Sequence, residues 1–224
     1  MRPTSRNVRP TTQNVRRADV TDPHAEGGIV LPYVGRRPML GDECFVAPTA
    51  VLVGDVVAGA GCSFWFHTVA RGDVHYIRLG DRTNVQDGAV LHVTNRTRPL
   101  VIGSDVSIGH GAIVHGCTIR DRVLVGMGAV VMDGAEIGED CLIGARALVT
   151  ERTVVPPRSL VFGSPARVVR PLRDDEIARI RQNADGYVRY SRVYLGLDRP
   201  AENPFYDPPE PQNWTEDGAP GSEG

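Results

Sequence analysis

The chain lacks long apolar runs, a strong net charge and closely spaced cysteines. No stretch of 18 apolar residues occurs in its 224 residues, so the sequence predicts no membrane-spanning helix. The net charge of −2 leaves no general basic face, which argues against non-specific binding to nucleic acid. The four cysteines form no CxxC motif, and the first residues, MRPTSRNVRPTTQNVRR, lack the apolar segment of a secretory signal. We therefore expect a reduced, cytoplasmic protein.

An apolar residue recurs at every sixth position over most of the chain. The frame contains Val46, Leu52, Ala58, Phe64, Ala70, Leu79, Val85, Leu91, Ile102, Ile108, Val114, Ile119, Val125, Val131, Ile137, Ile143, Val149, Val155 and Val161. A period of six suits a short strand followed by a corner, three of which make one triangular coil. Coils of this kind stack at about 4.8 Å with the apolar residue inward. The repeat predicts an all-β solenoid, a parallel β-helix of hexapeptide repeats.

The repeat divides the chain into four segments. Residues 1–27 have no periodicity and are predicted to be a flexible arm, and residues 28–171 form the β-helix domain. Apolar residues at three-or-four spacing predict a C-terminal α-helix at 172–196, with Asp174 as its N-cap, packed beside the solenoid. Residues 197–224 are acidic and rich in proline, which predicts disorder in the isolated chain.

The position after the inward apolar residue often holds glycine or alanine, but some repeats place another side chain there. In the first two thirds of the chain these are Trp65, Arg71, Gln86, His92 and His115. Arg120, Met132, Thr150, Pro156 and Phe162 also break the pattern, and the sequence gives no functional interpretation of them. A departure from a local rule marks a place to look for function. His92 and His115 occupy the same position of their repeats, so they can lie on one face in neighbouring coils. His110 stands one position later in its repeat, which places it on the adjacent face.

Three-fold packing would bring these three histidines together. In a trimer of parallel prisms, one face of a subunit meets the adjacent face of the next. His92 and His115 of one chain can then converge with His110 of its neighbour. Three imidazoles with a fourth position open to water are typical of a catalytic zinc site, and the same donors suit Fe(II) or Co. The sequence therefore predicts a homotrimer with metal sites between its chains.

Two segments, RGDVHYIRLGDRTNVQDGAVLHV and IGHGAIVHGC, resemble the gamma-class carbonic anhydrase family of left-handed β-helix proteins. The resemblance covers about residues 40–195. It implies that His92, His110 and His115 bind zinc across a trimer interface. It also implies that the zinc activates water for attack on carbon dioxide, which yields bicarbonate.

The same resemblance implies roles for five further residues. Arg71 and Asp73 would form an intersubunit ion pair at the border of the site. Gln86 would hydrogen-bond the zinc-bound water or bicarbonate, with Asn84 close by. Asp87 would be a buried carboxylate that orients a neighbouring group.

The sequence departs from the best-characterised members of that family in its acidic residues. Those members carry a glutamate directly after RGD and an acidic loop after the first histidine ligand, and these acids export protons. Here Val74 follows RGD, and the loop VTNRTRPL contains two arginines and no acid. We therefore expect slow turnover. The sequence leaves open whether Tyr187 or Tyr190 of the terminal helix reaches the site.

Two other functions fit the same repeat. Many hexapeptide-repeat trimers are acyltransferases that use coenzyme A and a single histidine base, and VFGSPARVVR resembles a segment that they share. A trimeric scaffold that retains a metal for stability without enzymatic activity is the second alternative. Three convergent histidines favour the carbonic anhydrase interpretation, because a transferase needs only one.

Overall fold

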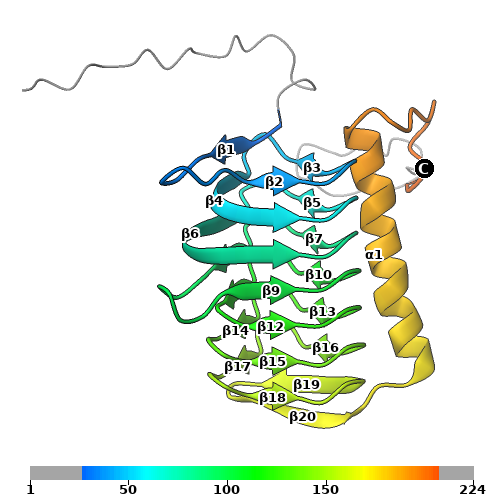
Figure 1. Ribbon diagram of the computed structural model, residues 1–224. Coiled ribbons are helices and arrows are strands. Elements are labelled where there is room, and N and C mark those ends of the chain that lie inside the picture. The colour runs from blue at the N-terminus through cyan, green and yellow to red at the C-terminus, as the bar shows by residue number, and fades with distance from the viewer. Residues whose placement is uncertain (1–26, 207–224) are drawn as a thin grey trace, which may run out of the picture.

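Residues 27–206, which the computed structural model describes, wind into a triangular prism with one long helix along its side (Figure 1). Most of the predicted arm and tail, residues 1–26 and 207–224, lies outside the described residues. Each complete coil contributes three short parallel strands, and the coils stack along the prism. The predicted left-handed β-helix of hexapeptide repeats is confirmed.

One face of the prism is an eight-stranded sheet, and a twelve-stranded sheet covers the other two faces. The eight strands are β3 (Phe45–Val46), β5 (Ser63–Phe64), β7 (Asn84–Val85), β10 (Ser107–Ile108), β13 (Leu124–Val125), β16 (Leu142–Ile143), β19 (Ser159–Gly163) and β20 (Ala166–Pro171). The twelve are β1 (Ile29–Leu31), β2 (Met39–Leu40), β4 (Val51–Ala58), β6 (Val69–Leu79), β8 (Val90–His92), β9 (Leu100–Ile102), β11 (Ile113–His115), β12 (Thr118–Ile119), β14 (Val130–Val131), β15 (Glu136–Ile137), β17 (Leu148–Val149) and β18 (Val154–Val155). Because β6 is long enough to pass a corner, pairing with β8 and with β9, it joins the two faces into one sheet.

The inward positions of the repeat form the core. Every apolar residue of the predicted frame is 8% exposed or less, and residues such as Val85, Ile108 and Val125 pair in register from coil to coil. Burying a side chain of this size contributes about 1.5–3 kcal/mol to folding. The residues that the six-residue period selects are therefore the residues that form the interior of the prism.

The two ends of the prism are closed differently. At the C-terminal end, β20 turns back and pairs antiparallel with β19, so the edge of the last coil is covered instead of exposed. At the other end, β1 and β2 both pair with the long strand β4. A tight turn between Tyr33 and Arg36 connects β1 to β2.

The helix α1 (Asp174–Tyr194) packs along the eight-stranded sheet. Ile177 and Ile180 are buried against Leu160 and Leu172. The predicted N-cap, Asp174, is wrong: Arg173 is the N-cap, and its backbone N–H donates to the carboxylate of Glu176 at 2.9 Å. A glutamate three residues after the N-cap satisfies that N–H, which leaves Asp174 as the first helical residue.

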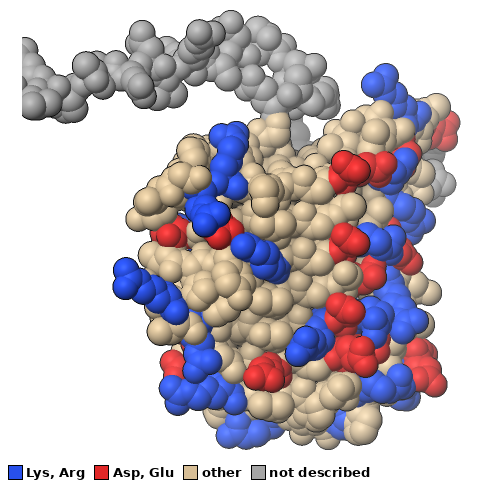
Figure 2. Space-filling view, in the orientation of Figure 1, with Lys and Arg blue, Asp and Glu red and all other residues tan. Residues whose placement is uncertain are grey.

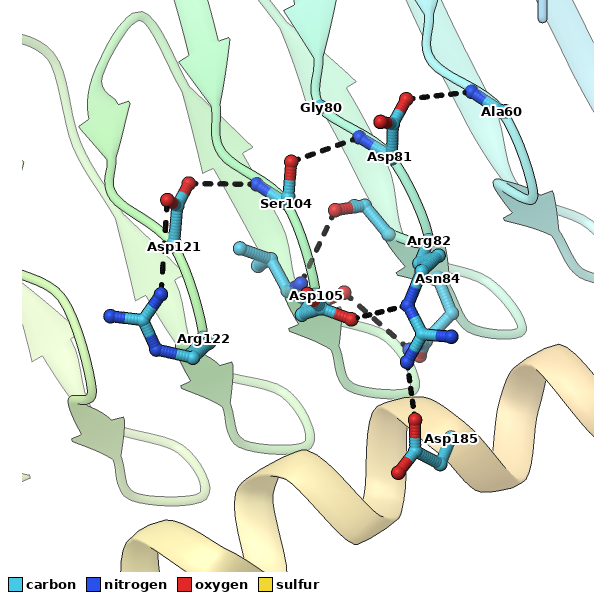
Figure 3. Close-up of polar contacts among 12 residues, drawn as sticks. Ala60, Gly80, Asp81, Arg82, Asn84, Ser104, Asp105, Asp121, Arg122 and Asp185 are labelled. Carbon is cyan, nitrogen blue, oxygen red and sulfur yellow. Dashed lines mark hydrogen bonds and ion pairs between the residues drawn. The ribbon is translucent and has the colours of Figure 1, made fainter.

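A column of alternating charge fixes the register of α1 on the prism. Successive corners beside the helix carry Arg82, Asp105, Arg122, Asp140 and Arg158. Arg82 contacts Asp105 at 2.7 Å, and Arg122 contacts Asp140 at 2.8 Å. The helix adds the opposite charge at matching heights, through Asp185 to Arg82 (Figure 3), Arg181 to Asp140 and Asp174 to Arg158. Figure 2 shows acidic and basic side chains interspersed along the helix side of the molecule. Exposed ion pairs contribute only about 0.2–1 kcal/mol each, but sliding the helix along the prism would oppose like charges.

Side chains also link one coil to the next at this edge. Asp81 accepts the N–H of Ala60 at 2.8 Å, Ser104 accepts the N–H of Asp81, and Asp121 accepts the N–H of Ser104 (Figure 3). These bonds explain a glycine of the repeat, since a Cβ on Gly103 would lie 2.2 Å from the carboxylate of Asp121.

The first ten residues of the predicted tail lie against α1. Phe205 packs on Tyr190 with ring centroids 4.7 Å apart, and Arg192 pairs with Asp198 at 3.0 Å. Across residues 27–206 no helix has both the length and the apolar character needed to cross a membrane.

Truncating the side chain of Ile180 tests how strongly the packing of α1 against the prism stabilises the fold. Ile180 is 1% exposed, so Ile180→Ala leaves a cavity between helix and prism, and we expect a loss of about 2–5 kcal/mol in the free energy of unfolding. Arg179→Ala, one residue away with its side chain 76% exposed, is the control and should change this free energy by less than about 0.5 kcal/mol. Urea unfolding measures both, and equal effects would contradict the packing.

The first turn of α1 makes stability depend on pH. Two hydrogen bonds from Arg170 and the N–H of Arg173 lower the pKa of Glu176 to about 2 from its ordinary value of 4.5. The ionised carboxylate therefore stabilises the folded chain above pH 4.5, and this contribution is lost as the pH falls toward 2. Glu176→Gln has no such charge to lose, so its melting temperature should fall less than that of the wild type across this window. If the melting temperatures of the two proteins fell equally between pH 4.5 and pH 2, Glu176 would not be the source of this pH dependence.

Candidate metal centre

Two of the predicted metal ligands lie side by side. His92 ends β8 and His115 ends β11, and parallel pairing places the two residues in direct register. Their rings face each other, with Nδ1 of His92 3.0 Å from Nε2 of His115. Both side chains are partly exposed, at 18% and 33%.

A carboxylate holds the far nitrogen of each ring. Nε2 of His92 lies 3.1 Å from Asp73 of β6, in the coil before it. Nδ1 of His115 lies 2.5 Å from Asp133, which follows β14 in the coil after it. Four side chains therefore form one column along the prism, in the order carboxylate, imidazole, imidazole, carboxylate.

The electrostatics of this column favour a cation between the rings. Burial raises the pKa values of Asp73 and Asp133, but hydrogen bonds from Arg71 to Asp73, from Thr94 to Asp133 and from the histidines outweigh it, so both pKa values lie below the ordinary range. Burial and then the charge of Arg71 lower the pKa of His92. A neutral imidazole that donates its N–H to a carboxylate presents a lone pair at its other nitrogen. When both imidazoles are neutral and donate to their carboxylates, two lone pairs face each other at 3.0 Å, and a metal between them would turn repulsion into binding.

The donor set fits a divalent metal. Two nitrogens bound to one zinc at about 2.0–2.1 Å in tetrahedral geometry lie about 3.3 Å apart, close to the separation in this chain. Ligating histidines almost always give their other N–H to a carboxylate, a backbone carbonyl or water.

Arg71 and Asp73, which were predicted to pair between subunits, contact each other within the single chain. Nη1 of Arg71 lies 2.5 Å from Oδ2 of Asp73. Both residues belong to β6, and a spacing of two places them on the same face of the strand, which makes this contact available locally.

The third predicted ligand, His110, has different neighbours. It follows β10 at the next corner, where Nδ1 lies 2.8 Å from Asp87. Asp87 also accepts the N–H of Phe66 at 3.2 Å, so it orients His110 as a fixed acceptor. The expectation that Asp87 is buried is wrong for the single chain, because its side chain is 41% exposed at this corner.

Gln86 and Asn84 lie on the His110 side of the molecule. Gln86 is buried and donates from Nε2 to Asn84 at 3.0 Å, and Asn84 donates to Ser107 at 2.8 Å. Gln86 and His110 line one cavity of about 370 Å³, together with Met127, Phe162 and Tyr187.

Tyr187, not Tyr190, reaches this corner. The hydroxyl of Tyr187 lies 3.5 Å from Nε2 of His110, and its ring packs on Trp65 at 5.4 Å. Burial, followed by the charge of Asp87, raises the pKa of Tyr187 to about 12, so the hydroxyl stays protonated near neutral pH. Tyr190 packs edge to face on Phe205, and it lines a neighbouring cavity together with Asp87.

The predicted residues therefore fall into two groups, and the structure adds one residue to each. We call Arg71, Asp73, His92 and His115, with Asp133 added, the pair half-site. We call Asn84, Gln86, Asp87 and His110, with Tyr187 added, the corner half-site. Within residues 27–206, no three His, Cys, Asp or Glu side chains are arranged to hold a metal in one chain.

Asp133 and the helix residue Tyr187 complete groups that the sequence outlined only in part. Asp133 was missed, although it follows His115 by 18 residues, about one coil, which is a readable signal in a solenoid. All three predicted ligands have an aspartate partner, Asp73, Asp87 or Asp133. The other two histidines of the described chain, His67 and His75, have none there.

Comparisons with known proteins agree with the β-helix fold and show to which family of hexapeptide-repeat proteins the chain belongs. The family model "Bacterial transferase hexapeptide (six repeats)" matches residues 116–151, and "Hexapeptide repeat of succinyl-transferase" matches residues 99–132. A protein named carbonic anhydrase from Geobacillus kaustophilus is 39% identical over 171 residues, covering 76% of this chain and 93% of the relative. The chain belongs to the gamma-class carbonic anhydrase-like family of hexapeptide-repeat proteins.

Other members of this family are longer or carry other names. Gamma carbonic anhydrase 1, mitochondrial, of Arabidopsis thaliana is 40% identical over 164 residues, covering 71% of this chain and 60% of the plant protein. The chain thus spans less than two thirds of the plant relatives that it matches. A crystal structure of a hexapeptide transferase family protein from Anaplasma phagocytophilum is 38% identical, with a TM-score of 0.72 and coverage of 75% and 98%.

Proposed function

We propose that the protein is a metal-dependent, gamma-type carbonic anhydrase that interconverts carbon dioxide and bicarbonate at the interfaces of a homotrimer. The observation that carries the proposal is the column Asp73, His92, His115, Asp133, in which two imidazole lone pairs converge between two ionised carboxylates. Zinc is the proposed metal, and Fe(II) or Co would suit the same donors.

The division into two half-sites supports an intersubunit centre. The pair half-site offers two ligands and the corner half-site offers one, on different faces of the prism. Exposed apolar side chains flank both: Val74 (36%) and Ile113 (43%) beside the pair, and Met127 (58%) and Phe162 (46%) beside the corner. Apolar patches of this kind mark protein interfaces. Three-fold packing would bury them and join His110 of one chain to His92 and His115 of the next.

The chain's own residues have separate roles in this reaction. A divalent metal supplies the Lewis acidity that makes water nucleophilic near neutral pH. Because Nε2 of Gln86 is held by Asn84, the carbonyl oxygen of Gln86 remains free to accept a hydrogen bond and orient water or bicarbonate. Apolar walls from Met127 and Phe162 suit carbon dioxide, which has no hydrogen-bond donor.

Proton export is the weak step of the proposed reaction. The three carboxylates nearest the histidines, Asp73, Asp87 and Asp133, are each held in a hydrogen bond to a ring. Val74 stands where an acid follows RGD in the best-characterised members. We therefore propose a competent centre with slow turnover.

The names of relatives support the reaction class, and the chain's thiols fit the proposed compartment. Carbonic anhydrase is the printed name of the relative that this chain covers to 93%. The four cysteines are free thiols, which suits a reducing cytoplasm.

Mixing two inactive variants tests whether the centre lies between chains. His110→Ala keeps an intact pair half-site, and His115→Ala keeps an intact corner half-site. Each variant alone should lose its metal and its hydration activity. Random co-assembly should restore about a quarter of the sites, since each site needs one chain of each kind. Metal analysis and stopped-flow hydration, after loading with zinc or anaerobically with iron, measure the recovery.

The control is His67→Asn, which changes a histidine outside both half-sites and suits the left-handed backbone there (φ 60°). This variant should retain metal and activity. No recovery in co-assembled trimers, or full metal content in His115→Ala alone, would refute the intersubunit centre.

The buffer dependence of turnover tests the weak proton step. If no side chain exports protons efficiently, an external acceptor should do so, and kcat for hydration should rise with imidazole concentration at constant pH and ionic strength. KM should change little, because the metal and Gln86 are untouched. A kcat that is already independent of buffer at low concentration would show that the chain has its own shuttle.

Acyl transfer from coenzyme A is a second candidate, favoured by the transferase name of the structural relative at TM-score 0.72. It predicts thiol release from acetyl-CoA with an amine or sugar acceptor, unaffected by a chelator. Metal that raises the melting temperature without hydration above background would instead indicate a metal-stabilised scaffold.

A further inference from the structure

The loop that interrupts the repeat after β8 contacts the metal column. Thr94 and Arg98 pair across this loop, with the N–H of Thr94 donating to the carbonyl of Arg98 at 3.0 Å. The hydroxyl of Thr94 donates to Oδ2 of Asp133. The other oxygen of that carboxylate, Oδ1, lies 2.5 Å from Nδ1 of His115.

The backbone near Asp133 is shaped to let its carboxylate reach the ring. Gly116, directly after His115, has a φ of 49°, and a Cβ there would lie 2.6 Å from Oδ1 of Asp133. Gly134 has a φ of 69°, and a Cβ there would lie 3.2 Å from the guanidinium carbon of Arg98. The two glycines thus leave room for the carboxylate and for the arginine beside it.

We propose that Thr94 and Asp133 are positioning residues that set the tautomer and direction of His115. With one oxygen bonded to Thr94 and the other to the ring, the carboxylate cannot rotate away. An ionised carboxylate at Nδ1 requires a proton on that nitrogen, so Nε2 carries the lone pair and points to Nδ1 of His92. The loop therefore supports a metal ligand, where the best-characterised family members use it to carry protons.

This inference rests on the proposed metal centre but not on its turnover. Asp73 does the same for His92 and is held by Arg71 of its own strand. Asp133 has no partner on β14, so its support comes from the loop. Fixing both rings in advance removes the freedom that a metal would otherwise have to restrict on binding.

The test compares zinc affinity and histidine tautomers in the full-length protein. Zinc affinity, measured by competition with a chromophoric chelator, should fall about tenfold in Asp133→Asn and up to about 100-fold in Asp133→Leu. The zinc affinity of Thr94→Val should also be lower than that of the wild type, because valine has no hydroxyl to hold Asp133. The affinity of Thr94→Ser, which keeps the hydroxyl, should equal the wild-type value. Asp121→Asn, which changes an aspartate at another corner, is the matched control and should have no effect.

The tautomer is read without metal. Nitrogen-15 NMR of the metal-free wild type should show His115 protonated at Nδ1, and Asp133→Leu should shift population to the Nε2–H form. If Asp133→Leu does not fold, Asp133→Asn and the two Thr94 variants carry the comparison. The inference would be overturned if the zinc affinity of every Asp133 and Thr94 variant lay within twofold of the wild-type affinity. It would also be overturned if His115 of the wild type carried its proton on Nε2. Normal zinc binding without hydration would instead refute the proposed function and leave this inference standing.

Discussion

In-register stacking of successive coils determines nearly every other feature of this protein. Parallel pairing at strand spacing places equivalent residues directly above one another, so side chains form columns instead of isolated contacts. Inside the prism the columns are apolar and close-packed. At the surface, stacking would oppose like groups in neighbouring coils, and the sequence avoids this by alternation. The ladder Arg82, Asp105, Arg122 is one result. The column through His92 and His115 is the exception, because it opposes two imidazoles between two carboxylates.

The corners show how stacking outweighs local backbone preference. Arg82, Asp105 and Arg122 all have φ between 55° and 58°, a left-handed conformation that costs L-residues about 1–2 kcal/mol. Glycine would relieve that cost but would remove the charged column that seats α1. Because α1 carries Tyr187 to 3.5 Å from His110, the ion pairs at the corners also position part of the corner half-site. Local backbone strain, helix register and site geometry are therefore linked along one edge of the prism.

The two half-sites differ in how much of their geometry is local. His92 and His115 are aligned by strand pairing alone, and strand β6 supplies both Asp73 and its partner Arg71. His110 depends on a corner carboxylate and on the helix. The coil turns at each corner, so a side chain there leaves the face of its neighbours. This turn explains why one chain presents two of the proposed ligands together and the third separately.

The six-residue period was sufficient to predict the β-helix, its buried residues and the shared face of His92 and His115. In a solenoid every repeat places the same position in the interior, so the period of the sequence directly predicts which residues are buried. The N-cap at Arg173 escaped prediction, since it depends on a side-chain contact to Glu176. Asp133 and Thr94 escaped as well, because the column through His115 joins residues from four coils and one irregular loop. The sequence by itself therefore determined the fold and proposed the candidate metal ligands. Only the tertiary structure decided which carboxylate holds which ring, because the direction of these side chains depends on neighbours far away along the chain.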